Sequence, residues 1–166
     1  YFFVMESLHA PWRIEYILDP KREEQSKSVF ADIARTDDDE GNYVIARTHS
    51  SFALLNSFPY NGGHVLVLPY REVQDTCDLT DEELLDLMLL VNHCKQAIAK
   101  VMKPDGFNIG INLGKVAGAG IEEHLHIHVV PRWRGDTNFM PVIGQTKILP
   151  EALADVAAKL RAALIQ

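Results

Sequence analysis

Cysteine is scarce in this sequence: Cys77 and Cys94 stand alone and lack the spacing of a metal site. Their isolation rules out a disulfide framework and predicts a reduced, cytoplasmic protein. Long apolar runs are missing as well, since no stretch approaches the roughly 20 residues that span a bilayer. We therefore expect no membrane partner.

Positive charge is also in short supply. Lys and Arg together number 16 against 23 Asp and Glu, and the formal net charge is −7. Such a chain lacks the general basic surface that binds nucleic acid. The negative charge of an anionic substrate would have to be stabilised locally, by backbone amides or by a few basic residues at the binding site.

The length of 166 residues suits one domain with a proper core, so we expect a single domain over residues 1–166. An apolar content of 47% and a charged content of 23% are ordinary for a soluble globular protein. The four residues before Met5 are too short for a secretory signal. We add the hypothesis that Met5 is the natural start and that residues 1–4 come from cloning.

The stretch from Glu123 to Pro131 alternates histidine with aliphatic residues, a pattern typical of a strand. Successive side chains of a strand point to opposite faces, so His124, His126 and His128 share one face. Neighbouring imidazoles then lie about 6–7 Å apart, close enough to act on one bound group. Three of the seven histidines fall within these five positions, and we place the chemistry there.

Three interpretations of these histidines compete. A solvated polar face is the plainest, but three histidines at period two are unusual for it. Two of them could share one Zn²⁺ with a third ligand from elsewhere, such as His64 or His49. Alternatively, a neutral imidazole attacks phosphorus when its other ring nitrogen donates to a fixed acceptor.

The rest of the sequence predicts the elements around this strand. Turn signals separate strands at residues 43–48, 52–56, 64–69 and 107–113. A capping box, Thr80 with Glu83, opens a long helix, and a final helix begins near residue 150. Residues 28–34 can form a short helix, and Asp37–Gly41 reads as a solvated turn. The apolar stripe of the long helix marks its buried face: Leu84, Leu87, Met88, Val91, Cys94, Ile98 and Val101.

Two polar segments flank the histidines. Residues 114–120 form a small-residue loop whose backbone amides could bind anionic oxygens. This loop feeds directly into the histidine strand, which places amide donors beside a nucleophile. After the strand, Arg132 and Arg134 could neutralise phosphate and Trp133 could stack on a base, although an ordinary surface loop explains them equally well.

The motif His-Leu-His-Ile-His-Val-Val resembles the histidine triad (HIT) family of nucleotidyl hydrolases and transferases. Residues 52–56 and 63–69 look like its ribose-binding strand and its Gly-His-x-Leu-x-x-Pro element, and residues 112–114 like the start of its phosphate loop. The segments 117–120 and 132–139 look most like the diadenosine tetraphosphate phosphorylase branch. The resemblance implies an α+β fold with about five antiparallel strands, one long central helix and a C-terminal helix, in a homodimer whose sheets meet.

The resemblance also implies residue roles. His126 would be the nucleophile that forms a nucleotidyl-histidine, His128 would contact phosphate and orient the leaving group, and His124 would position His126. Asn56 would bind the ribose. Phosphate oxygens would be held by Asn112 and by the amides of Gly118, Ala119 and Gly120, with Arg132 and Trp133 as further substrate-binding residues.

Two departures from the family pattern stand out. Many members carry Gln-Ser or Gln-Thr just before the triad, where this sequence has Ala119 and Gly120 followed by Ile121. Many bacterial members also carry Cys-x-x-Cys near the start, where this sequence has Ser28 and Ala31. Without those thiolates a structural zinc site is less well supported.

We therefore predict an enzyme that cleaves dinucleoside polyphosphates through a covalent His126 intermediate, by hydrolysis or by phosphorolysis. It would require no cofactor, and Mg²⁺ would enter only as a chelate of the substrate. Three alternatives stay open: a purine nucleoside phosphoramidate hydrolase of the same family, a metal-dependent hydrolase, and a nucleotide-binding module without turnover.

Overall fold

Five antiparallel strands form one sheet in the order β1-β2-β3-β5-β4. The computed structural model describes residues 29–136 and 151–164, which belong to one compact unit. The hypothesis on residues 1–4 and the comparison at Ser28 lie outside these residues. The strands are β1 (Val44–Arg47), β2 (Ser51–Leu55), β3 (Val65–Pro69), β4 (Gly106–Ile111) and β5 (Ile127–Arg132). The predicted five-stranded α+β fold is confirmed.

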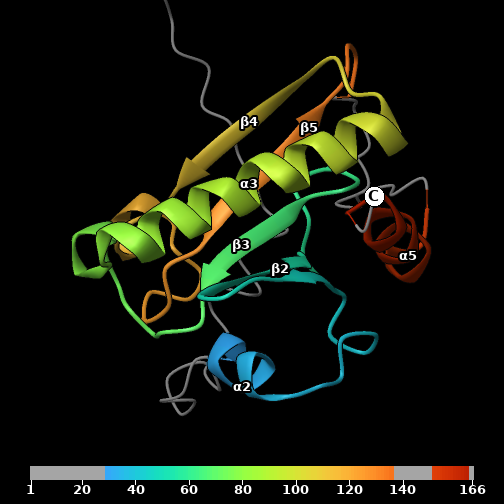
Figure 1. Cartoon of the computed structure of the whole chain (residues 1–166). Helices are drawn as coiled ribbons and strands as arrows, with labels where there is room; N and C mark the ends of the chain where they lie inside the picture. Colours follow the sequence, from blue (N-terminus) through green and yellow to red (C-terminus); the bar gives the residue numbers. More distant parts are fainter. Residues whose placement is uncertain (1–28, 137–150, 165–166) are drawn as a thin grey trace, which may run out of the picture. The chain divides into compact units, whose positions relative to one another are not determined.

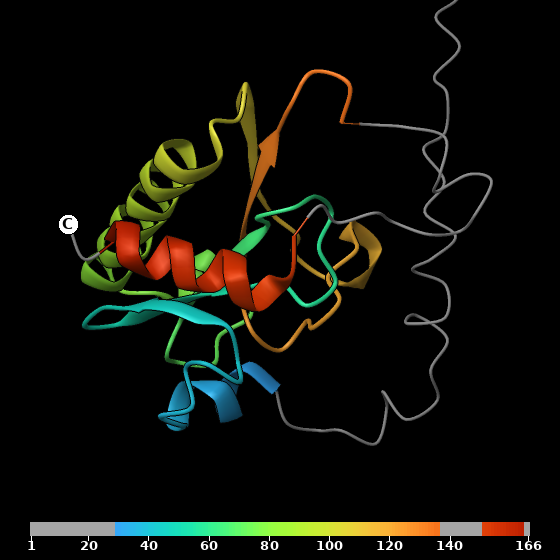
Figure 2. The same cartoon turned by 90° about the vertical axis from the view of Figure 1, so that its right-hand side faces the viewer.

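Three helices of the α type complete the described part of the chain. They are α2 (Val29–Arg35), α3 (Asp81–Met102) and α5 (Leu153–Leu164). Short 3₁₀ turns, Thr76–Asp78 and Lys115–Ala117, precede α3 and follow β4. Figure 1 shows α3 lying across β3 and β5, and Figure 2 shows α5 beside it. None of the described helices is long and apolar enough to cross a membrane.

The two faces of the sheet have different partners, because neighbouring residues of a strand point to opposite sides. On one face Ala53, Leu55, Val65 and Val67 pack against α3 and α5 in the larger apolar cluster. On the other face a smaller cluster includes Phe30 of α2 with residues of β1, β2 and β3: Val44, Phe52, Leu54, Leu66 and Leu68. We call this second side the site face.

Helix α3 begins where the sequence predicts, at the capping box of Thr80 and Glu83. The Thr80 side chain accepts a hydrogen bond from the Glu83 amide at 3.2 Å, and the Glu83 carboxylate accepts one from the Thr80 amide at 2.8 Å. This capping box satisfies two amides that the first helical turn leaves without partners. Lys103 ends the helix in the left-handed conformation, at a φ of 49°.

The predicted buried stripe of α3 is wrong at two positions. Leu87, Val91, Cys94 and Ile98 are buried, but Leu84 is 38% exposed and Met88 41% exposed. Helical periodicity identifies an apolar stripe but does not fix how far it extends over the sheet. The sheet covers the sector that contains Leu87 and Leu90 and leaves the neighbouring apolar sector uncovered within the described part of the chain.

Candidate active site

The histidine segment enters the sheet later than its sequence pattern predicts. Strand β5 begins at Ile127, so of the three histidines only His128 lies within it. Before that point the backbone uses other partners. The amide of Leu125 donates to the carbonyl of Val73 at 2.7 Å, and the carbonyl of His124 accepts from the ring of His126. These bonds replace the strand pairing that would otherwise continue.

The prediction that the histidines share one face is confirmed. Leu125, Ile127 and Val129 belong to the apolar cluster under α3. His128 pairs with Leu66, which lies on the site face. The rings of His126 and His128 meet edge to face, with centroids 4.9 Å apart.

The protons of His124 and His126 are fixed by backbone carbonyls. Nε2 of His124 donates to the carbonyl of Pro69 at 2.8 Å. Nδ1 of His126 donates to the carbonyl of His124, also at 2.8 Å. Because a carbonyl can only accept, Nδ1 of His126 must carry the proton, and the lone pair of the neutral ring lies on Nε2. This nitrogen makes no hydrogen bond to another described residue.

The tautomer of His128 is fixed through a second histidine. The backbone amide of Tyr60 donates to Nδ1 of His64 at 2.9 Å. Neutral His64 must therefore hold its proton on Nε2, which lies 2.9 Å from Nδ1 of His128 and donates to it. His128 then carries its own proton on Nε2. Adjacent to a nucleophilic nitrogen at His126, this N–H is suited to bond a phosphate or leaving-group oxygen.

Tyr60 and Asn112 complete the surroundings of His128. The Tyr60 ring stacks on His64 and His128, with centroid distances of 4.7 and 5.4 Å. The side-chain Nδ2 of Asn112 lies 3.4 Å from Nε2 of His128. Nε2 of His128 is a donor in the tautomer derived above. The Asn112 side-chain amide can accept this hydrogen bond when it is rotated so that Oδ1 faces Nε2.

Burial keeps the first two imidazoles neutral. Only 6% of His126 is exposed and His124 is fully buried. Burial lowers the pKa of both rings below the ordinary value of 6.5, against the opposing effect of their backbone hydrogen bonds. The Phe30 ring contributes to this burial, with its centroid 5.9 Å from His124 and 5.6 Å from His126. A neutral His126 is the form that can act as a nucleophile.

The predicted anion loop lies next to the triad in the chain. Gly118 has a φ of 90°, which a residue with a side chain would rarely adopt, so glycine suits this position. The amides of Gly118 and Ala119 donate within the loop, to the carbonyls of Lys115 and Gly114. A phosphate would have to replace these bonds. The role of residues 118–120 in phosphate binding stays a prediction.

The predicted residues after the triad make contacts of their own. Arg132 donates through Nε and Nη2 to the carboxylate of Asp136, and through Nη1 to Asn108. The amide of Trp133 donates to the same carboxylate. Asp136 also accepts from Asn61 at 2.9 Å, which ties this turn to the loop that carries Tyr60. Substrate binding by Arg132 and Trp133 stays a prediction.

Asn56, the predicted ribose-binding residue, follows β2 directly. Its side-chain oxygen accepts from the amide of Phe58 at 2.9 Å, and its Nδ2 lies 3.4 Å from Nδ1 of His64. The structure therefore brings Asn56 next to the His64–His128 pair. Its role toward ribose also stays a prediction.

Metal ligation has no cluster to support it among the described residues, where no three His, Cys, Asp or Glu side chains come together to hold an ion. His64, named as a ligand in that alternative, bonds instead to His128 and to the Tyr60 amide. His49 lies in the connection between β1 and β2.

Phe30 and Tyr60 are site residues that the sequence interpretation did not identify. Both are aromatic and sit in segments without a recognisable motif: a short helix and a Pro-Tyr-Asn-Gly turn. An aromatic residue in a polar turn is a weak signal, and only the folded chain brings these two against the imidazoles.

Known proteins are similar to this chain in sequence and in fold. The sequence pattern of the HIT domain matches residues 39–135. AP-4-A phosphorylase of Mycobacterium tuberculosis is 42% identical over 157 residues, which cover 91% of this chain and 80% of that protein. The asymmetrical bis(5'-nucleosyl)-tetraphosphatase of Schizosaccharomyces pombe is 43% identical over 96 residues, covering 58% and 52%. The Zn-bound histidine triad family protein of Mycobacterium smegmatis superposes with a TM-score of 0.68 at 28% identity, covering 84% and 94%.

A match over residues 39–135 contains the whole sheet and the triad, so the chain belongs to the HIT family. The expectation drawn from the triad motif and its neighbouring elements is thereby confirmed.

The derived tautomers predict an NMR spectrum. Long-range ¹H–¹⁵N correlations should show a protonated Nδ1 in His126 and a protonated Nε2 in His128 near pH 7. On acidification His124 and His126 should stay neutral below pH 6.5, because burial depresses their pKa. A protonated Nε2 in His126 would contradict the assignment of the nucleophilic atom.

Proposed function

We propose that this protein is a dinucleoside polyphosphate phosphorylase that works through a covalent nucleotide on Nε2 of His126. The observation that carries the proposal is the 2.8 Å bond from Nδ1 of His126 to the carbonyl of His124, which leaves the lone pair on Nε2. The 42% identity to AP-4-A phosphorylase over 91% of the chain supports phosphate, rather than water, as the final acceptor.

The reaction has two displacements at the α-phosphorus. Nε2 of His126 attacks, an N–P bond forms, and the P–O bond to the leaving nucleotide breaks. With diadenosine tetraphosphate, ATP leaves and AMP stays on the ring. Inorganic phosphate then attacks the same phosphorus, ADP leaves, and the imidazole is restored. The N–H of His128 stabilises the oxygens that gain charge in both steps.

The predicted binding residues have defined parts in this proposal. Asn56 holds the ribose. Asn112, the loop amides of residues 118–120 and Arg132 hold the phosphates, and Trp133 stacks on a base. No cofactor takes part, and Mg²⁺ is carried in by the polyphosphate. We also place the protein in the cytoplasm, where its free Cys77 and Cys94 would stay reduced.

Product analysis with diadenosine tetraphosphate tests the proposed reaction. In the presence of inorganic phosphate we expect ADP and ATP in equal amounts, and almost no turnover without phosphate. AMP and ATP formed without phosphate would identify a hydrolase instead. His126→Ala should lower kcat/KM by at least about three orders of magnitude, because the nucleophile is gone.

The matched control is His93→Ala, which removes an exposed imidazole from α3 and should leave kcat/KM unchanged. The His126→Ala variant should still bind nucleotide, as measured by calorimetry. Turnover that survives in His126→Ala would refute the nucleophile assignment.

We further propose that two copies of this chain form a homodimer through β4 and α3. Strand β4 is at the edge of the sheet and pairs only with β5 in the described part of the chain. Ile109 and Ile111 of β4 are exposed, as are Leu85, Met88 and Leu89 of α3. An open strand edge with apolar side chains beside it favours pairing with a second copy.

The oligomeric state of Ile109→Glu tests this interface. A carboxylate buried without a partner is strongly unfavourable, so the variant should elute as a monomer while the unaltered protein elutes as a dimer. Ala162→Glu makes the same charge change on the exposed side of α5 and should leave the dimer intact. Light scattering coupled to size-exclusion chromatography measures all three. A dimer in Ile109→Glu would exclude this interface.

A further inference from the structure

Helix α2 lies against the triad on the site face, and it is short. Seven residues make about two turns, and a helix of that length is not stable alone in water. Its position must therefore come from tertiary contacts. Since Phe30 of α2 touches the rings of His124 and His126, that position decides whether an apolar ring or water lies beside the nucleophile.

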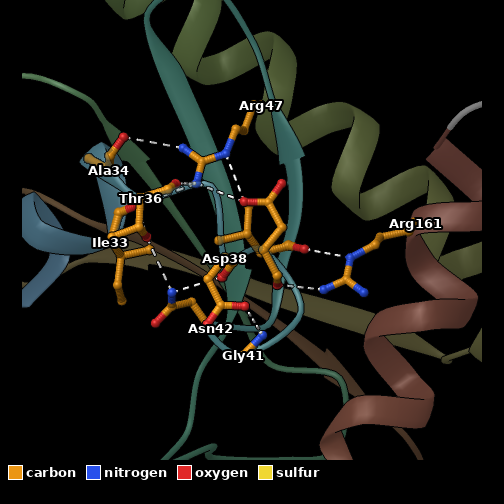
Figure 3. Close-up of polar contacts among 10 residues, drawn as sticks. Ile33, Ala34, Thr36, Asp38, Gly41, Asn42, Arg47 and Arg161 are labelled. Carbon is orange, nitrogen blue, oxygen red and sulfur yellow. Dashed lines mark hydrogen bonds and ion pairs between the residues drawn. The ribbon is translucent and has the colours of Figure 1, made fainter.

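Arg47 of β1 holds the end of α2. Its Nη1 donates to the carbonyl of Ala34 at 3.4 Å, and its Nη2 donates to those of Ile33 and Thr36 at 3.3 and 2.9 Å (Figure 3). The last carbonyls of a helix lack partners within it, and they carry the negative end of its dipole. A guanidinium supplies both the donors and the positive charge they require.

Asp39 and Arg161 hold Arg47 in place. The Oδ1 of Asp39 accepts from Nε and Nη2 of Arg47, at 2.9 and 2.7 Å. Arg161 of α5 donates to the backbone carbonyls of Asp39 and Val44, at 2.7 and 2.6 Å (Figure 3). Asp39 is thus held by Arg47 at its side chain and by Arg161 at its backbone. We call Arg47, Asp39 and Arg161 the α2 clamp.

We propose that Arg47 is a positioning residue for the reaction: through the α2 clamp it holds the ring of Phe30 against His124 and His126 and keeps water from the nucleophile. The proposal rests on the function assigned above to His126. It gives Arg47 a part that its ion pair alone would not predict, because a partly exposed pair contributes little to stability.

The environment of His126 makes the proposal measurable by pH. The titratable groups that face His126 are His124 and His128, and Phe30 faces it from α2. The charged residues of α2, Asp32 and Arg35, are exposed and pair with each other at 3.9 Å. If Phe30 moves away, the ring of His126 gains water and its depressed pKa rises toward 6.5.

The test combines Arg47→Ala, Phe30→Ala and the double variant. Arg47→Ala should lower kcat/KM at neutral pH by about 10- to 100-fold, because small displacements at a reacting centre have effects of this size. The acid limb of its pH profile should move up toward 6.5. In the double variant the loss should match that of Phe30→Ala alone, since both changes remove the same contact.

The control is Arg35→Ala, which removes an exposed arginine from the same helix and should change neither value. Losses that multiply in the double variant, or an acid limb that stays in place in Arg47→Ala, would overturn the proposal. Asp39→Asn removes the one negative charge of the clamp and should move the acid limb in the same direction. Thermal unfolding checks that every variant is folded.

An NMR titration of His126 without substrate separates this proposal from the proposed function. If the unaltered protein does not turn over, the function fails, while the titration still reports on the clamp. If the protein does turn over but His126 titrates identically in folded Arg47→Ala and Asp39→Asn, the clamp proposal fails alone.

Discussion

The hydrogen bond from Nδ1 of His126 to the carbonyl of His124 is the interaction on which the site depends. A backbone carbonyl only accepts and does not change its protonation, so this bond determines which ring nitrogen of His126 keeps its lone pair. Strand pairing would otherwise use that carbonyl. The late start of β5 at Ile127 is therefore part of the chemistry, because it leaves the His124 carbonyl available to the ring.

The two faces of the sheet have different roles: one packs against the helices of the core, and the other carries the histidines of the site. Helices α3 and α5 bury one face, where Leu125, Ile127 and Val129 anchor the histidine segment. The other face carries the imidazoles, where Phe30 of α2 contacts His124 and His126 and Tyr60 stacks on His128. Apolar packing of the neighbouring residues against α3 holds the backbone of each histidine, and a hydrogen bond of fixed direction orients its ring. Burial lowers the pKa of His124 and His126, so these two rings are neutral at neutral pH.

Much of this arrangement could be predicted from local sequence. Strict alternation places His124, His126 and His128 on one face because side chains of an extended chain alternate, and Thr80 with Glu83 predicts the start of α3 for an equally local reason. The later start of the strand could not be predicted, because the bond from Leu125 to Val73 joins distant segments.

Contacts between distant segments account for what the sequence did not reveal. Phe30 and Tyr60 reach the imidazoles only once the sheet has formed, and nothing near them in the sequence points to that role. The apolar stripe of α3 predicts a buried Met88, but the stripe does not determine which partner covers it, and Met88 is 41% exposed. The roles of Arg132 and Trp133 depend on a bound nucleotide and stay predictions.

Capture of the covalent intermediate tests the central claim most directly. The protein would be mixed with diadenosine tetraphosphate without inorganic phosphate, quenched within one turnover, digested at alkaline pH and analysed by mass spectrometry. We predict one added AMP on the peptide that contains the triad, with fragmentation placing it on His126 and acid removing it. Turnover without any adduct, or an adduct on a different residue, would contradict the account.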